Sequence, residues 1–273
     1  MHQDMPQVQV SIDIANSLIK TRELSLSEIQ TKIDSSKIPQ SFNTKRIATI
    51  KVFADYNEAG HSMNLVGVYR GSDPELKDEY VIVSAHLDHV GGVGNMLYYP
   101  GANDNASGSA AVLELARIFS NKKSSLKRSI LFVLFGSEEK GLVGSEYLAE
   151  NLPVDASQIV AMFNMDCISY GDSIKVGNGK SNPGLWNMAM EQDSLYINRT
   201  VHSTWGGGGA DLTPFHNKGI PGLYFVTTNS YDYLHLPGDT PETLNVSLYT
   251  DLVKLVSLMC YEIAIEGSLP ENE

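Results

Sequence analysis

The stretch VIVSAHLDHVGG, residues 81–92, joins an apolar run to a group of polar side chains. Its first three residues are β-branched and predict a buried strand. The strand ends at His86, and Asp88 and His89 follow just before two glycines. Folding alone does not require imidazole and carboxylate groups at the tip of a buried strand. The stretch therefore indicates a binding site at the strand end.

Composition narrows the classes of protein to consider. The chain has 273 residues, of which 42% are hydrophobic and 19% charged, as in one globular domain with or without an appendage. The 20 basic and 32 acidic residues leave a net charge of −12, which disfavours nucleic acid and anionic membranes as partners. No apolar run is long enough to span a bilayer, and MHQDMPQVQVSI lacks the features of a signal peptide. Cys167 and Cys260 lie in apolar segments, which favours buried free thiols.

The first forty residues differ in pattern from the rest of the chain. SIDIANSLIKT and SLSEIQTKID carry apolar residues at helical spacing, and Ser25 with Glu28 fits a capping box. We expect a helical appendage over residues 1–40 and the main domain over 41–273. RIATIKVFADY and SMNLVGVYRG, at the start of the main domain, predict a β-hairpin.

Strands and helices then alternate along the chain. We expect strands at 81–86, 129–136 and 158–165, and helices at 106–121, 142–150 and 247–266. This alternation predicts an α/β sandwich with a largely parallel central sheet.

Polar residues collect where these strands end. Ligands of open α/β sheets bind beyond the carboxyl ends of the strands. The residues at those ends and in two further loops are His86, Asp88, Asp104, Glu138, Glu139, Asp166 and His235. Each alone has a structural interpretation, such as an N-cap for Asp104, but carboxylates gathered at one edge repel one another. A bound cation removes the repulsion, and imidazole with carboxylate ligands favours zinc, with cobalt or manganese as substitutes.

Five ligands suffice for two ions when one carboxylate is shared between them. Adjacent residues of extended chain point in opposite directions, so one of Glu138 and Glu139 can bind an ion while the other acts as general base. Asp88, two residues after His86, can orient that imidazole.

Five ordered motifs carry a resemblance to a known family: SAHLDHVG, GANDNASGSAAVLELAR, LFGSEEKGLVGS, NMD and LHLPGDTPETL. Over roughly residues 45–265 the chain resembles the di-zinc aminopeptidases, which include bacterial leucyl aminopeptidases and glutamate carboxypeptidase-like exopeptidases. The resemblance implies a mixed sheet between helices, two zinc ions, and a peptide substrate with a free N-terminus. By residue, it implies that His86 and Asp166 hold one ion, Glu139 and His235 hold the other, Asp104 bridges, Glu138 is the general base and Asp88 orients His86.

The same resemblance carries further expectations. Residues 1–40 resemble the tail of a protease-associated domain, and 41–273 would be the zinc peptidase domain. Relatives with protease-associated domains are mostly exported, so we expect a secreted or cell-envelope location, with a cytoplasmic one as the alternative. Many relatives carry Tyr before the last zinc-binding His, where this chain has Leu234; Tyr231 and Tyr233 are the candidates to replace it. GGGGADLTPF keeps only Asp211 of the relatives' Ser-Asp-His segment.

Three alternatives stay open on the same scaffold: a glutamate-type carboxypeptidase, a glutaminyl cyclase with a single zinc, and a binding ectodomain without catalysis. A carboxypeptidase needs a cation for the substrate's terminal carboxylate, usually Arg. The acidic residues of the motifs favour a free amine instead. A binding ectodomain is expected to lose ligands, and this chain keeps all five.

Overall fold

The computed structural model describes residues 8, 10–19, 24–51, 57, 59–95, 97–121, 126–267 and 269–270. The chain divides into two compact units, Met1–Gly60 and His61–Glu273.

The first unit contains the two predicted helices, α1 (Ile12–Ile19) and α2 (Leu26–Ser36). The predicted capping box is present: the Glu28 N–H donates to Ser25 Oγ at 3.3 Å, and the Ser25 N–H donates to Glu28 Oε2 at 2.7 Å. The first strand of the predicted hairpin is absent over residues 46–51, and its remainder, 52–56, lies outside the described residues.

The second unit is built on one six-stranded sheet. Its spatial order is β1 (Leu65–Tyr69), β5 (Ser129–Phe135), β2 (Tyr80–His86), β6 (Ile159–Met165), β8 (Gly222–Thr227) and β7 (Ile174–Gly177). The four central strands run parallel, and the two edge strands run antiparallel to their neighbours. The mixed, largely parallel sheet is thereby confirmed. The strand predicted as the second half of a hairpin, β1, obtains its backbone hydrogen bonds from β5.

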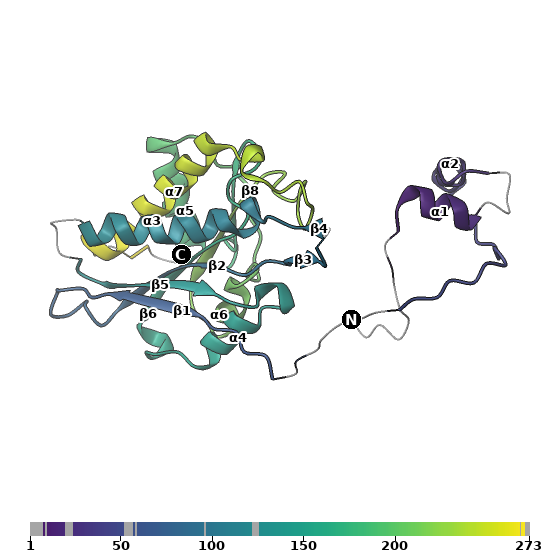
Figure 1. The fold of residues 1–273 in the computed structure, drawn as a ribbon. Coiled ribbons are helices and arrows are strands. Elements are labelled where there is room, and N and C mark those ends of the chain that lie inside the picture. The colour runs from purple at the N-terminus through teal and green to yellow at the C-terminus, as the bar shows by residue number, and fades with distance from the viewer. Residues whose placement is uncertain are drawn as a thin grey trace. The chain divides into compact units, whose positions relative to one another are not determined.

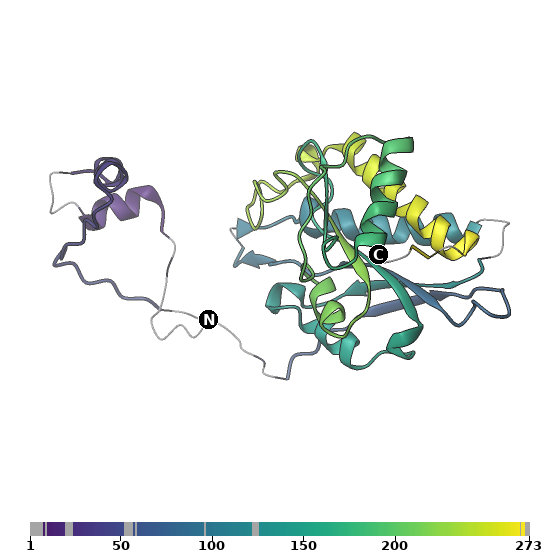
Figure 2. The ribbon, with the colours of Figure 1, turned by 180° about the vertical axis from the view of Figure 1, so that it is seen from behind.

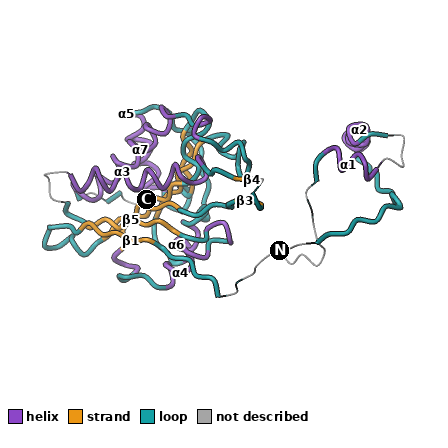
Figure 3. Tube along the Cα trace, in the orientation of Figure 1, coloured by secondary structure: helices purple, strands orange, loops and turns teal. Residues whose placement is uncertain are grey.

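Helices cover both faces of this sheet (Figures 1 and 2). Side chains alternate between the faces along each strand, so each face has its own apolar cluster. One cluster is shared with α3 (Gly108–Asn121), α5 (Pro183–Tyr196) and α7 (Val246–Tyr261), and the other with α4 (Val143–Glu150) and α6 (Leu212–Asn217). In the tube view the strands are orange and the flanking helices purple (Figure 3). A small hairpin, β3 (Gly92–Val93) with β4 (Leu97–Tyr98), follows β2 in the chain.

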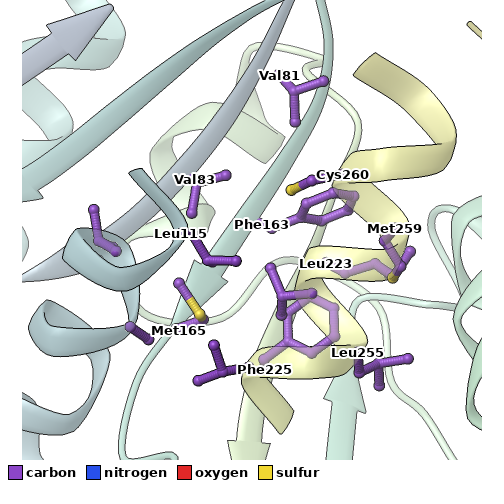
Figure 4. Close-up of a cluster of buried hydrophobic side chains, with 14 of the residues drawn as sticks. Val81, Val83, Leu115, Phe163, Met165, Leu223, Phe225, Leu255, Met259 and Cys260 are labelled. Carbon is purple, nitrogen blue, oxygen red and sulfur yellow. The ribbon is translucent and has the colours of Figure 1, made fainter. Parts of the chain in front are cut away.

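On the side of α3 and α7, side chains of these helices and of the central strands form a buried core (Figure 4). Val81 and Val83 of β2 belong to the same buried cluster as Leu115 of α3, and the rings of Phe163 and Phe225 meet edge to face at 5.9 Å. Burial of these apolar side chains is the dominant stabilising contribution and fixes the strand tips.

Both cysteines are free and buried, as predicted. Within the described part of the chain, no helix has the length and apolar character needed to cross a membrane.

Candidate metal centre

Three of the four parallel strands lead into predicted site residues. His86 is the last residue of β2, and Asp166 follows directly on β6. Glu138 and Glu139 open a short 3₁₀ turn, Glu138–Lys140, soon after β5. Because the strands are parallel, these residues lie at one edge of the sheet. With Asp104 and His235, they line one cavity of about 500 Å³.

His86, Asp104 and Asp166 form the first cluster. His86 Nε2 lies 3.3 Å from Asp104 Oδ1 and 3.3 Å from Asp166 Oδ1, and all three residues are buried. The other ring nitrogen of His86, Nδ1, lies 3.1 Å from the backbone oxygen of Asp88. A proton on Nδ1 would be donated to that carbonyl, which leaves Nε2 free to bind an ion.

His89, Asp104, Glu139 and His235 form the second cluster, and their donor atoms all lie within 4.8 Å of one another. His235 Nε2 is 2.8 Å from Glu139 Oε2, and His89 Nδ1 is 2.9 Å from Glu139 Oε1. The sequence pattern gives His89 no separate role, although the residue lies in the stretch that first pointed to the site. It lies three residues beyond the end of β2, where strand periodicity no longer indicates the direction of a side chain.

Asp104 belongs to both clusters. Its Oδ1 faces His86, and its Oδ2 lies 3.2 Å from His235 Nε2. The N–H groups of Asn103 and Asp104 donate to the Asp239 carboxylate at 2.8 and 3.0 Å, which fixes the backbone at this point. Asp104 Oδ2 is buried and has no hydrogen-bond partner among the described residues. A buried, unpartnered carboxylate oxygen that faces imidazole nitrogens is suited to a cation.

Asp88 contacts the turn that carries both glutamates. Its carboxylate accepts the N–H of Glu138 at 3.0 Å and that of Glu139 at 3.2 Å. The same carboxylate lies farther from His86, with Oδ1 3.9 Å from Nδ1. The Asp88 side chain therefore fixes the Glu138–Lys140 turn more directly than it fixes the imidazole.

The electrostatics of these side chains reflect their crowding. Burial, with Asp211 and Asp166 nearby, raises the pKa of Glu138 to about 8, although His86 opposes the shift. Burial lowers the pKa of His86, but hydrogen bonds with Asp104 and Asp166 outweigh it and raise this pKa to about 12. The carboxylates thus draw positive charge onto the only group of the first cluster that can carry it. A bound cation would take over that role.

Tyrosines form the wall beside Asp166. The Tyr224 hydroxyl donates to Asp166 Oδ2 at 3.0 Å and lies 3.4 Å from the Tyr231 hydroxyl. Tyr231 lines the cavity, whereas Tyr233 packs edge to face on Tyr170, with 5.2 Å between ring centroids. Tyr231 and Tyr233 are the two candidates to replace the tyrosine that many relatives carry at the position of Leu234. Of the two, Tyr231 reaches the cavity.

Residues 64–259 match the family model of peptidase family M28. The chain belongs to peptidase family M28. Among curated M28-like relatives, aminopeptidase YwaD of Bacillus subtilis is 28% identical over 250 residues, which cover 85% of this chain and 51% of that protein. A probable leucine aminopeptidase of Trichophyton verrucosum is 29% identical over 199 residues, or 70% of this chain and 56% of that protein. This M28 chain therefore spans about half the length of the curated relatives that it matches.

Solved structures agree with the M28 fold. BSAP, a zinc aminopeptidase from Bacillus subtilis, superposes with a TM-score of 0.63 at 27% identity, over 75% of this chain and 51% of that chain. The aminopeptidase from Aneurinibacillus sp. strain AM-1 gives a TM-score of 0.63 at 25% identity, over 76% and 48% of the two chains. The glutaminyl cyclase of Porphyromonas gingivalis, at 22% identity and a TM-score of 0.61 over 73% and 77%, shares the fold.

Proposed function

We propose that this chain is a metal-dependent aminopeptidase that removes the N-terminal residue of peptides with a free amino group. Membership of family M28 and its similarity to aminopeptidases support the reaction class. The observation that carries the proposal is the position of Asp104, whose two carboxylate oxygens face two separate ligand clusters. A carboxylate in that position is suited to bridging a pair of ions.

The donors fit a zinc pair, with cobalt or manganese as substitutes. In the proposal, His86 and Asp166 hold one ion, Glu139 and His235 hold the other, and Asp104 is shared. Zinc bound here would polarise the scissile carbonyl and lower the pKa of a water molecule.

Glu138 is the proposed general base. It lines the cavity beside the ligands, in a turn held by Asp88. Burial raises the pKa of its carboxyl to about 8, which suits a group that accepts a proton from water and returns it to the leaving amine. Cations at both positions would lower that pKa, so that Glu138 is ionised and ready to accept the proton near neutral pH.

The lining of the cavity favours a substrate amine over a substrate carboxylate. Four carboxylates line it, those of Asp104, Glu138, Glu139 and Asp166, and none of its described lining residues is Lys or Arg. Arg117, the arginine within the second motif, pairs with Glu114 on the exposed side of α3. Bound ions would neutralise Asp104, Glu139 and Asp166, so the preference rests on the missing basic partner: the described lining gives a terminal carboxylate no Lys or Arg to pair with.

The test is hydrolysis of leucine p-nitroanilide and of its N-acetylated form, together with a count of bound metal. We expect turnover of the free amine alone and about two ions per chain. Turnover of only the acetylated substrate, or none by the fully loaded protein, would reject an aminopeptidase. Pyroglutamate formation from a glutaminyl peptide with one ion per chain would identify a cyclase instead.

Three expectations from the sequence remain proposals. These are a zinc peptidase domain over 41–273, a protease-associated tail over 1–40, and a secreted or cell-envelope location.

A further inference from the structure

We propose that His89 is a fourth protein ligand of the second metal position, so that the two positions of the pair are unequal. The first position would have three protein donors, from His86, Asp104 and Asp166. The second would have four, from His89, Asp104, Glu139 and His235. This inference rests on the proposed metal-dependent function and concerns how the chain distributes its ligands between the two ions.

The spacing of the donor atoms supports His89 as a ligand. Zinc binds nitrogen and oxygen at about 2.0–2.2 Å, so two donors on one tetrahedral ion lie roughly 3.3–3.5 Å apart, and closer at smaller angles. The ring nitrogen of His235 lies 3.2 Å from Asp104 Oδ2 and 2.8 Å from Glu139 Oε2. His89 Nδ1 lies 3.6 Å from Asp104 Oδ2 and 2.9 Å from the other oxygen of Glu139, Oε1. His89 therefore faces the same two carboxylates, at distances close to those of His235.

The ring of His89 is held in this position by its surroundings. Its side chain is only 12% exposed, against 46% for that of His235. Gly101 packs against the ring: a Cβ added there would lie 2.7 Å from His89 ring carbons. The rings of His89 and His235 meet edge to face at 5.7 Å, with Asp104 and Glu139 against both. Packing on these sides reduces the rotamers open to His89 and favours the one that points Nδ1 at the carboxylates.

A simpler arrangement would have the Nδ1–H of His89 donate to Glu139 without contact to an ion. In that case His89 would orient one ligand and would not add a donor. The ligand role is favoured because the same nitrogen also faces Asp104, 3.6 Å from Oδ2, and the four donor atoms all lie within 4.8 Å of one another.

Unequal coordination predicts a division of roles. A zinc position with four protein donors is closed, whereas one with three keeps an open place for water or substrate. The second position should therefore fill first and hold its ion more tightly. The first position, beside Tyr224 and Asp166, should be the more open to the reacting group of the substrate.

The test compares two substitutions at this residue in metal-free protein. His89→Ala removes both the ligand and the hydrogen bond. His89→Asn keeps an N–H donor near the place of Nδ1 but replaces imidazole with a neutral amide, a much poorer zinc ligand. His202→Asn is the matched control, because His202 is exposed. Zinc is titrated against a chromogenic chelator, and the visible spectrum of the Co²⁺-loaded protein is recorded.

In wild-type protein and in the control we expect two binding events of different affinity. Both His89 substitutions should weaken the tighter event by more than the 10–100-fold typical of a residue that only hydrogen-bonds to a ligand, and both should change the Co²⁺ spectrum. If Asn retains the wild-type affinity while Ala loses it, His89 is a hydrogen-bond donor only. If both substitutions retain it, His89 has no role at the metal position. Either result overturns the proposal.

Wild-type protein provides a measurement that does not depend on the folding of a variant. Proton NMR of the Co²⁺-loaded chain should show three shifted imidazole N–H signals, from His86, His89 and His235; two would overturn the proposal. Failure of the proposed function is distinguishable, because a chain that binds two unequal ions yet hydrolyses no peptide would reject the aminopeptidase and leave the assignment of His89 intact.

Discussion

Asp88→Asn should reduce catalysis by weakening the turn that carries the two glutamates. The carboxylate of Asp88 accepts two backbone N–H groups, at 3.0 Å from Glu138 and 3.2 Å from Glu139. Asparagine keeps one acceptor oxygen and places an NH₂ group where the second acceptor was. A hydrogen bond to a charged group contributes about 1.5–3 kcal/mol. Because the Asp88 side chain is 26% exposed, water replaces part of that contribution, and we adopt the lower half of the range.

A loss of about 1.5–2 kcal/mol corresponds to a decrease of roughly 10–30-fold in kcat/KM, since each 1.36 kcal/mol is tenfold. The decrease should appear mainly in kcat, because the substitution displaces the general base. The second ion should also bind more weakly, because the substitution displaces Glu139. The assay is steady-state hydrolysis of leucine p-nitroanilide at saturating zinc, together with a metal titration. Asp73→Asn is the matched control: in a surface turn, Asp73 Oδ1 accepts the N–H groups of Glu75 and Leu76 at 2.9 and 3.1 Å.

Two results would refute this reasoning. Unchanged kcat/KM with both ions bound would show that the turn holds its geometry without Asp88. Selective loss of the ion at His86 would show that Asp88 acts through the imidazole, as the family resemblance implies, and not through the glutamates.

Three further predictions concern the same unit. Glu138→Gln should leave metal content near normal and lower turnover by about 10²–10⁴-fold, whereas Glu139→Gln should weaken metal binding; parallel metal counts and rates test both, and the reverse pattern would exchange the two roles. Removal of metal with a chelator should abolish activity, and added zinc or cobalt should restore it. Full activity of metal-free protein would contradict this. Burial raises the pKa of Asp211 to about 7 in the folded protein, above the unfolded value of about 3.9. The folded protein is therefore not destabilised by Asp211 below about pH 3.9, and it loses stability as the pH rises to 7. In metal-free protein, the melting temperature of Asp211→Asn minus that of wild type should therefore increase between pH 4 and 8. A difference that does not change with pH would contradict this.

Sequence pattern predicts the fold best where local signals agree. The strands β2, β5 and β6 are apolar runs that lead into titratable residues, and each lies within a residue or two of its predicted bounds. The strand β8 was not predicted, because GLYFVT is a short apolar run that periodicity alone cannot distinguish from a buried helical turn. The first strand of the hairpin was wrong over 46–51, because an alternating pattern indicates a strand only where a partner backbone is available.

The proposed ligand residues could be predicted because each lies at or soon after a strand end, or in a loop rich in turn residues. Tyr224 and His89 could not. Tyr224 lies inside an apolar strand, where core packing is the natural interpretation, and its hydrogen bond to Asp166 depends on how β8 pairs with β6. The contact of His89 with Glu139 joins residues fifty positions apart, so it arises only once β2 and β5 are paired.

The proposed ligands are spread along the chain, so metal supply would affect folding. His86 comes from the second strand of the unit and His235 from a loop after the last strand of the sheet, and unfolded chain does not hold them together. Ions that bind only the folded form stabilise it by RT ln(1 + [L]/Kd), about 4 kcal/mol at a thousandfold excess over Kd. Zinc would thus act as a cross-link across most of the unit's sequence. A chain deprived of it would be not merely inactive but shorter-lived, because proteases cleave the open form.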